Sequence, residues 1–306
     1  MEVRVTNILL EIVEPSAQPI YAITWSSDGQ YIAFGGDGCE ISLWNMKTNR
    51  WSTPLEGQQS SVQALAWSPD GTRLIAGYEN GGIDIWDITT QQVSISYHGH
   101  RGAISSVTCS PDGKYIASAG YDHTVQIWDV QTGQSSGIYE EHMDAVFSVA
   151  WSPTKNYIAS GGACDNVVYV WEWDTLKTVV SYQEHNDEVR SVAWSSDGIY
   201  LASGGADKTV QVWEALSGTH VYTYLGHTAN QFGIVTALAW SPDGKYLASA
   251  SDDCTVHVVS AKSGQHIAIC HDHQDHWWVR SVAWSPDSTA IASGDHDGRV
   301  LVWSIP

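Results

Sequence analysis

Short runs in which apolar and polar residues alternate recur along the whole chain, and turn-forming clusters separate them. In a representative unit, the run Ala103–Cys109 alternates with a period of two, which is typical of a half-buried β-strand. The cluster Ser110–Gly113 reads Ser-Pro-Asp-Gly and predicts a tight turn, because proline presets φ and glycine accepts a positive φ. Residues 114–119 and 124–128 predict two further strands, and a fourth is expected before His142. The unit therefore predicts one small sheet of four antiparallel strands.

The same pattern recurs seven times, at intervals of 42 to 46 residues. Most units carry one Trp at the end of the first predicted strand and a second Trp at the end of the third. The first-strand positions are Trp25, Trp67, Cys109, Trp151, Trp194, Trp240 and Trp284. The third-strand positions are Trp44, Trp86, Trp128, Trp171, Trp213, Val259 and Trp303. Such an interval is typical of one propeller blade, and radial stacking buries the faces that a lone sheet would expose. The pattern predicts an all-β fold, a seven-bladed β-propeller of four-stranded antiparallel blades, as a single domain over residues 1–306.

The last unit contains only three predicted strands, because Pro306 follows shortly after Trp303. Counting back from the first unit places the missing strand at Leu9–Val13, within residues 7–14. We expect this N-terminal strand to pair with the C-terminal blade and to close the ring. Deletion of residues 1–14 is then expected to open a sheet edge, causing aggregation or a large fall in melting temperature.

A recurring set of His, Ser, Asp and Trp makes the whole chain resemble the WD40-repeat family. Four units carry the set as His100, Ser118, Asp122 and Trp128; His142, Ser160, Asp165 and Trp171; His185, Ser203, Asp207 and Trp213; and His273, Ser293, Asp297 and Trp303. The resemblance implies that each set forms a buried hydrogen-bond chain inside its blade, where every polar group needs a partner. Ser, His and Asp also suggest a hydrolase, but a catalytic triad would occur once and would not include Trp.

Three units depart from this pattern. The departures are Ser16 and Gln58 in place of His in the first and second units, and Val259 in place of Trp in the sixth, which keeps His227, Ser249 and Asp253. Those blades lack the complete set, so we expect them to be the softer part of the ring.

The resemblance also implies where a partner binds. Insertions at 161–165, 228–234 and 273–278 fall in loops on the face that the family calls the top, and insertions on one face often mark the binding face. Aromatic and acidic groups around the channel mouth can hold an Arg or Lys side chain of a partner. The residues expected to bind a partner there are Tyr21, Asp37, Gln63, Glu79, Tyr121, Phe147, Glu188, Arg190, Phe232, Asp252, Trp278, Arg280 and His296. Strand alternation points Trp277 and Trp278 in opposite directions, so at most one of them faces the mouth.

The chain is strongly acidic, with 34 Asp and Glu against 14 Lys and Arg and a net charge of −20. Phosphate backbones and anionic membrane surfaces repel such a chain, which excludes nucleic-acid binding and membrane association. The charge serves either solubility or a preference for basic partners. The five Cys have no CxxC spacing, and the chain has neither a secretory leader nor an 18-residue apolar stretch. These features favour a cytoplasmic protein in a reducing compartment.

One tract resembles a metal site. Cys270, His271, His273 and His276 offer soft and imidazole ligands. However, His273 belongs to the repeated His–Ser–Asp–Trp set, and strand alternation separates the other three. We therefore expect no metal here, and no cofactor, since the chain also has no GxxxxGK[ST] phosphate loop.

The sequence favours a non-enzymatic protein-interaction scaffold, a monomer that binds a peptide or partner protein on its top face. Two alternatives remain open at this point. The chain can be a sensor or regulatory domain of a larger signalling protein, or it can be a small-ligand or enzymatic propeller with a site in the central channel.

Overall fold

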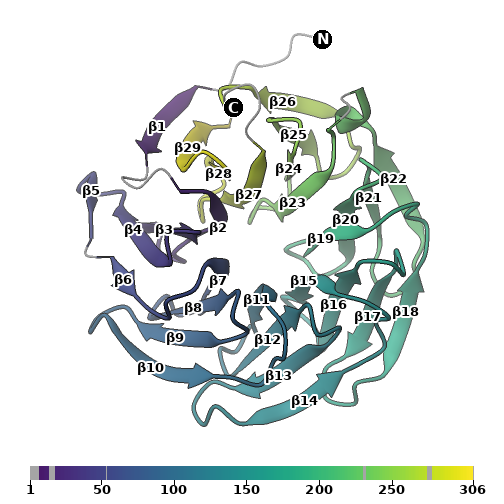
Figure 1. Ribbon diagram of the computed structural model, residues 1–306. Helices are drawn as coiled ribbons and strands as arrows, with labels where there is room; N and C mark the ends of the chain where they lie inside the picture. The colour runs from purple at the N-terminus through teal and green to yellow at the C-terminus, as the bar shows by residue number, and fades with distance from the viewer. Residues whose placement is uncertain (1–6, 14–17, 53, 230–231, 274–277, 306) are drawn as a thin grey trace.

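The computed structural model describes residues 7–13, 18–52, 54–229, 232–273 and 278–305. Figure 1 shows seven small sheets arranged like blades around a central axis, with each blade running outward from that axis. We number the blades 1 to 7 in chain order, beginning with the sheet that contains β2. The predicted all-β, seven-bladed propeller is confirmed.

The two strands nearest the axis are six residues long in every blade. The inner strands are β2 (Ile20–Trp25), β7 (Val62–Trp67), β11 (Ile104–Cys109), β15 (Val146–Trp151), β19 (Val189–Trp194), β23 (Val235–Trp240) and β27 (Val279–Trp284). The second strands are β3 (Tyr31–Gly36), β8 (Arg73–Tyr78), β12 (Tyr115–Gly120), β16 (Tyr157–Gly162), β20 (Tyr200–Gly205), β24 (Tyr246–Ser251) and β28 (Ala290–Asp295).

The third and outer strands complete the blades. The third strands are β4 (Glu40–Asn45), β9 (Ile83–Asp87), β13 (Val125–Asp129), β17 (Val168–Glu172), β21 (Val210–Glu214), β25 (Val256–Ser260) and β29 (Arg299–Ser304). The outer strands are β5 (Arg50–Trp51) with β6 (Leu55–Glu56), β10 (Gln92–Tyr97), β14 (Ser135–Tyr139), β18 (Thr178–Tyr182), β22 (His220–Tyr224), β26 (His266–Cys270) and β1 (Ile8–Val13). In blade 1 the outer position is divided, because β5 and β6 pair separately with β4. A short 3-10 helix, η1 (Gly226–Ala229), precedes β23. No helix in the described part of the chain is long and apolar enough to cross a membrane.

The turn between the inner and second strands has the geometry that Ser-Pro-Asp-Gly predicts. In blade 3, Ser110 donates its hydroxyl to Asp112 Oδ1 at 2.7 Å, and the same oxygen accepts the Lys114 N–H at 3.1 Å. Gly113 donates its N–H to the Ser110 carbonyl and has a φ of 70°. Glycine adopts this left-handed conformation without a steric penalty. The turn therefore reverses the chain within four residues.

The hydrophobic core lies between blades. Each of seven clusters of buried apolar side chains combines residues of two neighbouring blades. In one cluster Val125 and Tyr139 of blade 3 pack with Val146 and Trp151 of blade 4. A four-stranded sheet has two apolar faces, and each face is buried only when the next blade covers it. The ring is therefore the smallest unit that buries all of these residues.

The first Trp of the repeat connects adjacent blades. Trp194 donates its indole N–H to the Ala150 carbonyl at 3.1 Å, and Trp240 and Trp284 make the equivalent bonds, at 3.0 and 2.9 Å, to the preceding blades. These bonds join neighbouring inner strands at the centre of the ring. Trp25 and Trp67 occupy the same position in blades 1 and 2, but their indole N–H groups have no partner in the described residues.

The ring closes between the two ends of the chain, as predicted. Figure 1 shows β1 beside β29, and the two strands are antiparallel, with Ile12 opposite Val300. Ile12 is 2% exposed and packs between blade 7 and blade 1. At the centre, Ile23 of β2 donates its N–H to Ser281 Oγ of β27 at 3.1 Å. The predicted clasp strand is confirmed over Ile8–Val13.

Candidate functional site in the channel mouth

The predicted His–Ser–Asp sets form inside five blades. In blade 3, His100 contacts Ser118 Oγ through Nε2 at 2.8 Å and the Asp122 carboxylate through Nδ1 at 2.9 Å. Equivalent pairs occur at His142 with Ser160 and Asp165, His185 with Ser203 and Asp207, His227 with Ser249 and Asp253, and His273 with Ser293. Hydrogen bonds from His100 and from the Arg101 N–H lower the pKa of Asp122, outweighing the opposing effect of its burial. The carboxylate is therefore ionised and satisfied.

In blade 7 the carboxylate of the network is not the predicted one. His273 Nδ1 contacts Asp295 at 2.7 Å rather than Asp297, which lies in the following turn. Asp295 is fully buried at the position that Gly120 occupies in blade 3. A Cβ atom placed on Gly120 would lie 3.0 Å from His100 Nδ1, so a side chain at this position starts next to the imidazole. Asp295 therefore reaches the histidine first, and its other oxygen accepts the Asp297 and Arg299 N–H groups.

The indole part of the set forms in only three of the four blades in which it was predicted. Trp171, Trp213 and Trp303 donate their N–H to Ser160, Ser203 and Ser293 at 3.2, 3.2 and 2.8 Å. The prediction that Trp128 belongs to the network is wrong, because its buried indole N–H has no partner among the described residues. Its ring stacks on Tyr97 at 4.9 Å, whereas the equivalent stacks in blades 4 and 5 are 4.3 Å apart.

These networks are structural. The serines at Ser118, Ser160, Ser203, Ser249 and Ser293 are at most 3% exposed. Each lies behind its histidine, so its hydroxyl is inaccessible to a substrate carbonyl. A nucleophile must reach its substrate before any triad geometry matters, and this arrangement prevents it.

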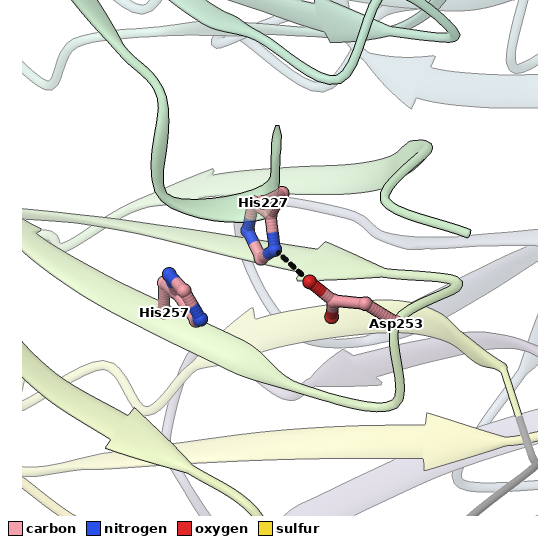
Figure 2. A group of neighbouring side chains, drawn as sticks. All are labelled: His227, Asp253 and His257. Atoms are coloured by element: carbon pink, nitrogen blue, oxygen red, sulfur yellow. Dashed lines mark hydrogen bonds and ion pairs between the residues drawn. The ribbon is translucent and has the colours of Figure 1, made fainter. Parts of the chain in front are cut away.

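Blade 6 contains an arrangement that the sequence analysis did not anticipate. Figure 2 shows His257 beside the His227–Asp253 pair, and the two imidazole rings stack 4.1 Å apart with an angle of 29° between their planes. His257 Nδ1 contacts the Tyr224 hydroxyl at 2.7 Å. Burial, followed by the neighbouring His227, lowers the pKa of His257 to about 3. In blades 3 and 5 a Gln at the position of His257 accepts a hydrogen bond from the equivalent tyrosine. The His at this Gln position was the feature of the sequence that could have indicated the arrangement.

A cavity of about 490 Å³ opens at the mouth of the channel, on the face where the inner strands begin. All seven blades contribute to its wall. Eight of the thirteen predicted partner-binding residues line it: Tyr21, Gln63, Tyr121, Phe147, Arg190, Asp252, Trp278 and Arg280. Ser105, Ile234 and Thr236 complete the lining. The structure therefore brings most of the predicted set together around one opening.

Asp37 and Glu79 act on the wall of the cavity through Tyr21. Burial first, and then a hydrogen bond to Asp37, raise the pKa of Tyr21 to about 12, with Glu79 contributing less. Asp37 also accepts the Ser61 hydroxyl at 3.1 Å.

His296, Glu188 and Phe232 complete the predicted set. The His296 ring meets the rings of Tyr21 and Trp278 at 6.4 and 5.8 Å. Glu188 forms an ion pair with Arg190. Phe232 is 57% exposed and does not line the cavity. The insertions at 228–234 and 273–278 include residues 230–231 and 274–277, so Trp277 lies outside the described residues.

The aromatic faces at the mouth are already covered by arginines of the chain itself. The Arg190 guanidinium lies 4.1 Å from the centre of the Phe147 ring, and that of Arg280 lies 4.6 Å from Trp278. Arg190 and Phe147 occupy the same inner-strand position in neighbouring blades, so radial stacking brings them together. The two faces expected to receive a cation from a partner therefore hold internal cations.

Asp252 lies near both arginines, but they do not satisfy all of the hydrogen-bonding capacity of its carboxylate. Its side chain is 11% exposed, and its Oδ1 is 3.6 Å from Arg280 Nη1. Burial raises the pKa of Asp252, while Arg280 and then Arg190 lower it. Asp252 Oδ1 and the Nε–H groups of Arg190 and Arg280 have no hydrogen-bond partner in the described part of the chain. These three atoms are themselves buried, so the surface that the mouth offers a ligand consists of the exposed parts of the arginine and aromatic side chains.

The tract at residues 270–276, whose ligands the sequence offered but for which no metal was expected, does not bring these side chains together in the described residues. Cys270 is buried at the end of β26, while His273 is occupied by Ser293 and Asp295. His276 lies outside the described residues.

Comparison with known proteins agrees with the fold. A family model described as the WD domain, G-beta repeat, matches the chain seven times, over residues 9–45, 50–87, 91–129, 133–172, 176–214, 218–260 and 264–304. No curated protein matches the chain.

Proposed function

Since the chain belongs to the WD40 family of WD-domain, G-beta repeat proteins, which generally act as interaction scaffolds, we propose that it binds a peptide or partner protein on its top face without catalysing a reaction. The observation that carries this proposal is the cavity at the channel mouth, to which all seven blades contribute side chains. A loop or chain segment that enters this cavity would contact every blade at once.

The mouth is well suited to this role because its groups are already ordered. Arg190 and Arg280 are held against aromatic rings, and Asp252, in the turn after β24, is mostly buried beside Arg280. Groups that are fixed before binding lose little entropy when a ligand arrives. Trp278, which is 39% exposed, and Tyr121, which is 52% exposed, add aromatic surface of the type found in binding hot spots.

The charge of the protein affects a partner both at long range and at direct contact. The net charge of −20 favours a partner that is basic overall, because unlike charges speed encounter over distances of about 10 Å. Within the mouth, the side chains of Arg190 and Arg280 are 36% and 30% exposed, and their accessible guanidinium N–H groups donate to carbonyl or carboxylate oxygens of the bound segment. We further propose a monomeric, single-domain protein of the cytoplasm that binds neither nucleic acid nor membranes.

The test is affinity capture from a lysate of the native host with three purified baits. They are the wild-type chain, Trp278→Ala/Phe147→Ala, and Trp51→Ala as the control. Trp51 is as exposed as Trp278, at 39%, but lies at the outer edge of blade 1. All three must show the same circular dichroism and comparable melting temperatures. We expect a protein retained by the wild type and by Trp51→Ala, and lost from the double variant.

Two results would contradict this assignment. Equal retention by all three baits would place the binding surface on the sides or the opposite face. Capture of no protein, together with a melting shift caused by a small molecule, would favour a ligand-binding propeller with its site in the channel.

A further inference from the structure

Blade 6 places two imidazoles and a carboxylate around one point inside the sheet. Figure 2 shows the Asp253 carboxylate pointing toward the rings of His227 and His257. One ligand atom from each of the three side chains lies within 4.8 Å of the others. His227 is 1% exposed and His257 is 6% exposed, so the group is screened from solvent.

We propose that His227, Asp253 and His257 bind a divalent transition-metal ion, with Zn²⁺ as the best match. Two imidazole nitrogens and one carboxylate oxygen are a ligand set that zinc uses with a fourth, open position. Ligand atoms about 2.0–2.2 Å from a tetrahedral ion lie roughly 3.4 Å from one another. His227 Nδ1 is 2.8 Å from Asp253 Oδ2, and all three ligand atoms lie within 4.8 Å of one another. The spacing needed by the ion is therefore compatible with these separations after small shifts of the side chains.

Each ligand is oriented by a second hydrogen bond. His227 Nε2 contacts Ser249 Oγ at 2.8 Å, and His257 Nδ1 contacts the Tyr224 hydroxyl at 2.7 Å. Asp253 Oδ1 accepts the Thr255 hydroxyl at 2.6 Å. Metal-binding histidines in proteins are held in this way through their other ring nitrogen. Here the arrangement leaves His227 Nδ1, His257 Nε2 and Asp253 Oδ2 directed at the common point.

The loss of the blade's Trp makes the required tautomer of His227 accessible. In blade 5, Trp213 donates its N–H to Ser203 Oγ, so the serine proton is available for His185 Nε2 and the Nδ1 proton faces Asp207. In blade 6, Val259 occupies the Trp position and supplies no donor. In the metal-free structure the His227 Nδ1–H donates to Asp253 at 2.8 Å. When an ion displaces that proton, Ser249 can accept a proton from His227 Nε2, which leaves the Nδ1 lone pair to bind the ion.

The third ligand is specific to this blade. Across from the network serine, other blades place a residue without an imidazole: Gln126, Tyr169, Gln211 and Leu301. Gln126 and Gln211 accept a hydrogen bond from Tyr97 and Tyr182, which are equivalent to the Tyr224 that His257 contacts in blade 6. His257→Gln therefore gives blade 6 a Tyr–Gln pair of the kind found in blades 3 and 5, while it removes one metal ligand.

The test uses the full chain, without an affinity tag and stripped of metal with a chelator, titrated with Zn²⁺ and then with Co²⁺. Metal content after dialysis, isothermal titration calorimetry and the visible absorption of tetrahedral Co²⁺ are measured for the wild type and His257→Gln. We expect about one ion per chain in the wild type, and at least a tenfold weaker affinity in the variant. Zinc at about 100 times its Kd is expected to raise the melting temperature of the wild type by about 5 °C, and that of the variant not at all.

A second variant separates this site from the neighbouring His-rich tract. His271→Gln/His276→Gln removes two imidazoles there but none of the proposed ligands. Zinc that is retained by this double variant and lost in His257→Gln supports the site in blade 6. The proposal would be overturned if zinc binding were lost in His271→Gln/His276→Gln instead, or if wild type and His257→Gln bound zinc equally. The two histidines would then be a stacked pair that is held by hydrogen bonds to Ser249, Asp253 and Tyr224. A His257→Gln melting temperature within a few degrees of the metal-free wild type confirms that the variant is folded.

Discussion

Arg299 and Glu11 lie 288 positions apart in the chain, and Arg299 donates its Nε–H to the Glu11 carboxylate at 3.0 Å. The contact joins β29 to β1, so it forms only when the two ends of the chain meet in the last blade. Arg299 also donates to the carbonyl of Asp272, which precedes the network histidine of the same blade. The clasp and the blade 7 network are therefore connected through one side chain.

The closure of the ring depends on the inward-facing side of β1. Ile12 is 2% exposed and its neighbour Val13 is 55% exposed, so the two residues offer a matched pair of positions on one strand. We expect Ile12→Asp to lower the free energy of unfolding by about 3 kcal/mol or more, because it places a charge in the core between blades 7 and 1. Val13→Asp should change it by less than about 0.5 kcal/mol. Urea unfolding of both variants measures the difference, and equal effects would show that β1 does not hold the ring closed.

The indole N–H groups of Trp128 in blade 3 and Trp213 in blade 5 are predicted to contribute differently to the free energy of unfolding. Trp213 donates to Ser203 at 3.2 Å, whereas the Trp128 N–H is buried without a partner in the described residues. Trp213→Phe is expected to cost about 1 kcal/mol more than Trp128→Phe, since only the former breaks a hydrogen bond and leaves a buried hydroxyl with fewer partners. Both changes remove similar apolar area, so differential scanning calorimetry of the pair isolates the hydrogen bond. A larger loss for Trp128→Phe would contradict the network described here.

Asp295 is predicted to be the essential carboxylate of blade 7. It is fully buried and contacts His273, while Asp297 lies in the following turn. Asp295→Asn should lower the free energy of unfolding by about 2 kcal/mol, because it replaces the buried carboxylate that accepts hydrogen bonds from His273 and two backbone N–H groups with a weaker acceptor. Asp297→Asn is expected to change it by less than about 0.5 kcal/mol. Chemical unfolding at pH 7 compares them, and the opposite order would restore Asp297 to the network.

His257 predicts a specific loss of stability in acid. Its pKa falls from 6.5 to about 3 on folding, so the unfolded chain binds one more proton between these pH values. The contribution of this group is complete above pH 6.5 and declines by up to about 1.4 kcal/mol for each pH unit below it. Between pH 7.5 and pH 5.0 the wild type should lose about 2 kcal/mol more than His257→Gln.

The measurement is urea unfolding at both pH values with a chelator present, so that no metal contributes. The other titratable groups that face His257, namely His227, Asp253, His266 and His271, are present in both proteins, so the comparison reports His257 together with its interactions with them. A parallel loss of stability in the two proteins would mean that His257 is protonated in the folded state.

The repeat itself predicted most of the fold. The spacing of Trp, the Ser-Pro-Asp-Gly turns and the three-strand final unit were sufficient for the seven blades and for the clasp at Ile8–Val13. This was possible because each blade is encoded by a local segment, and because the turn and strand periods are local properties of the chain. Most of the mouth residues were also identified, since register within the repeat places them at equivalent ends of equivalent strands.

Only the tertiary structure decided which side chains meet. Asp295 displaces Asp297 because Asp295 ends β28 beside the histidine, whereas Asp297 lies in the turn that follows. Arg190 covers Phe147, and His257 stacks on His227, through contacts between strands that are distant in sequence. The sequence by itself determined the ring, because strands and turns follow from short-range preferences. The partners inside each blade and at the mouth depend on distances of a few ångströms between separate segments, and these exist only after the blades have stacked.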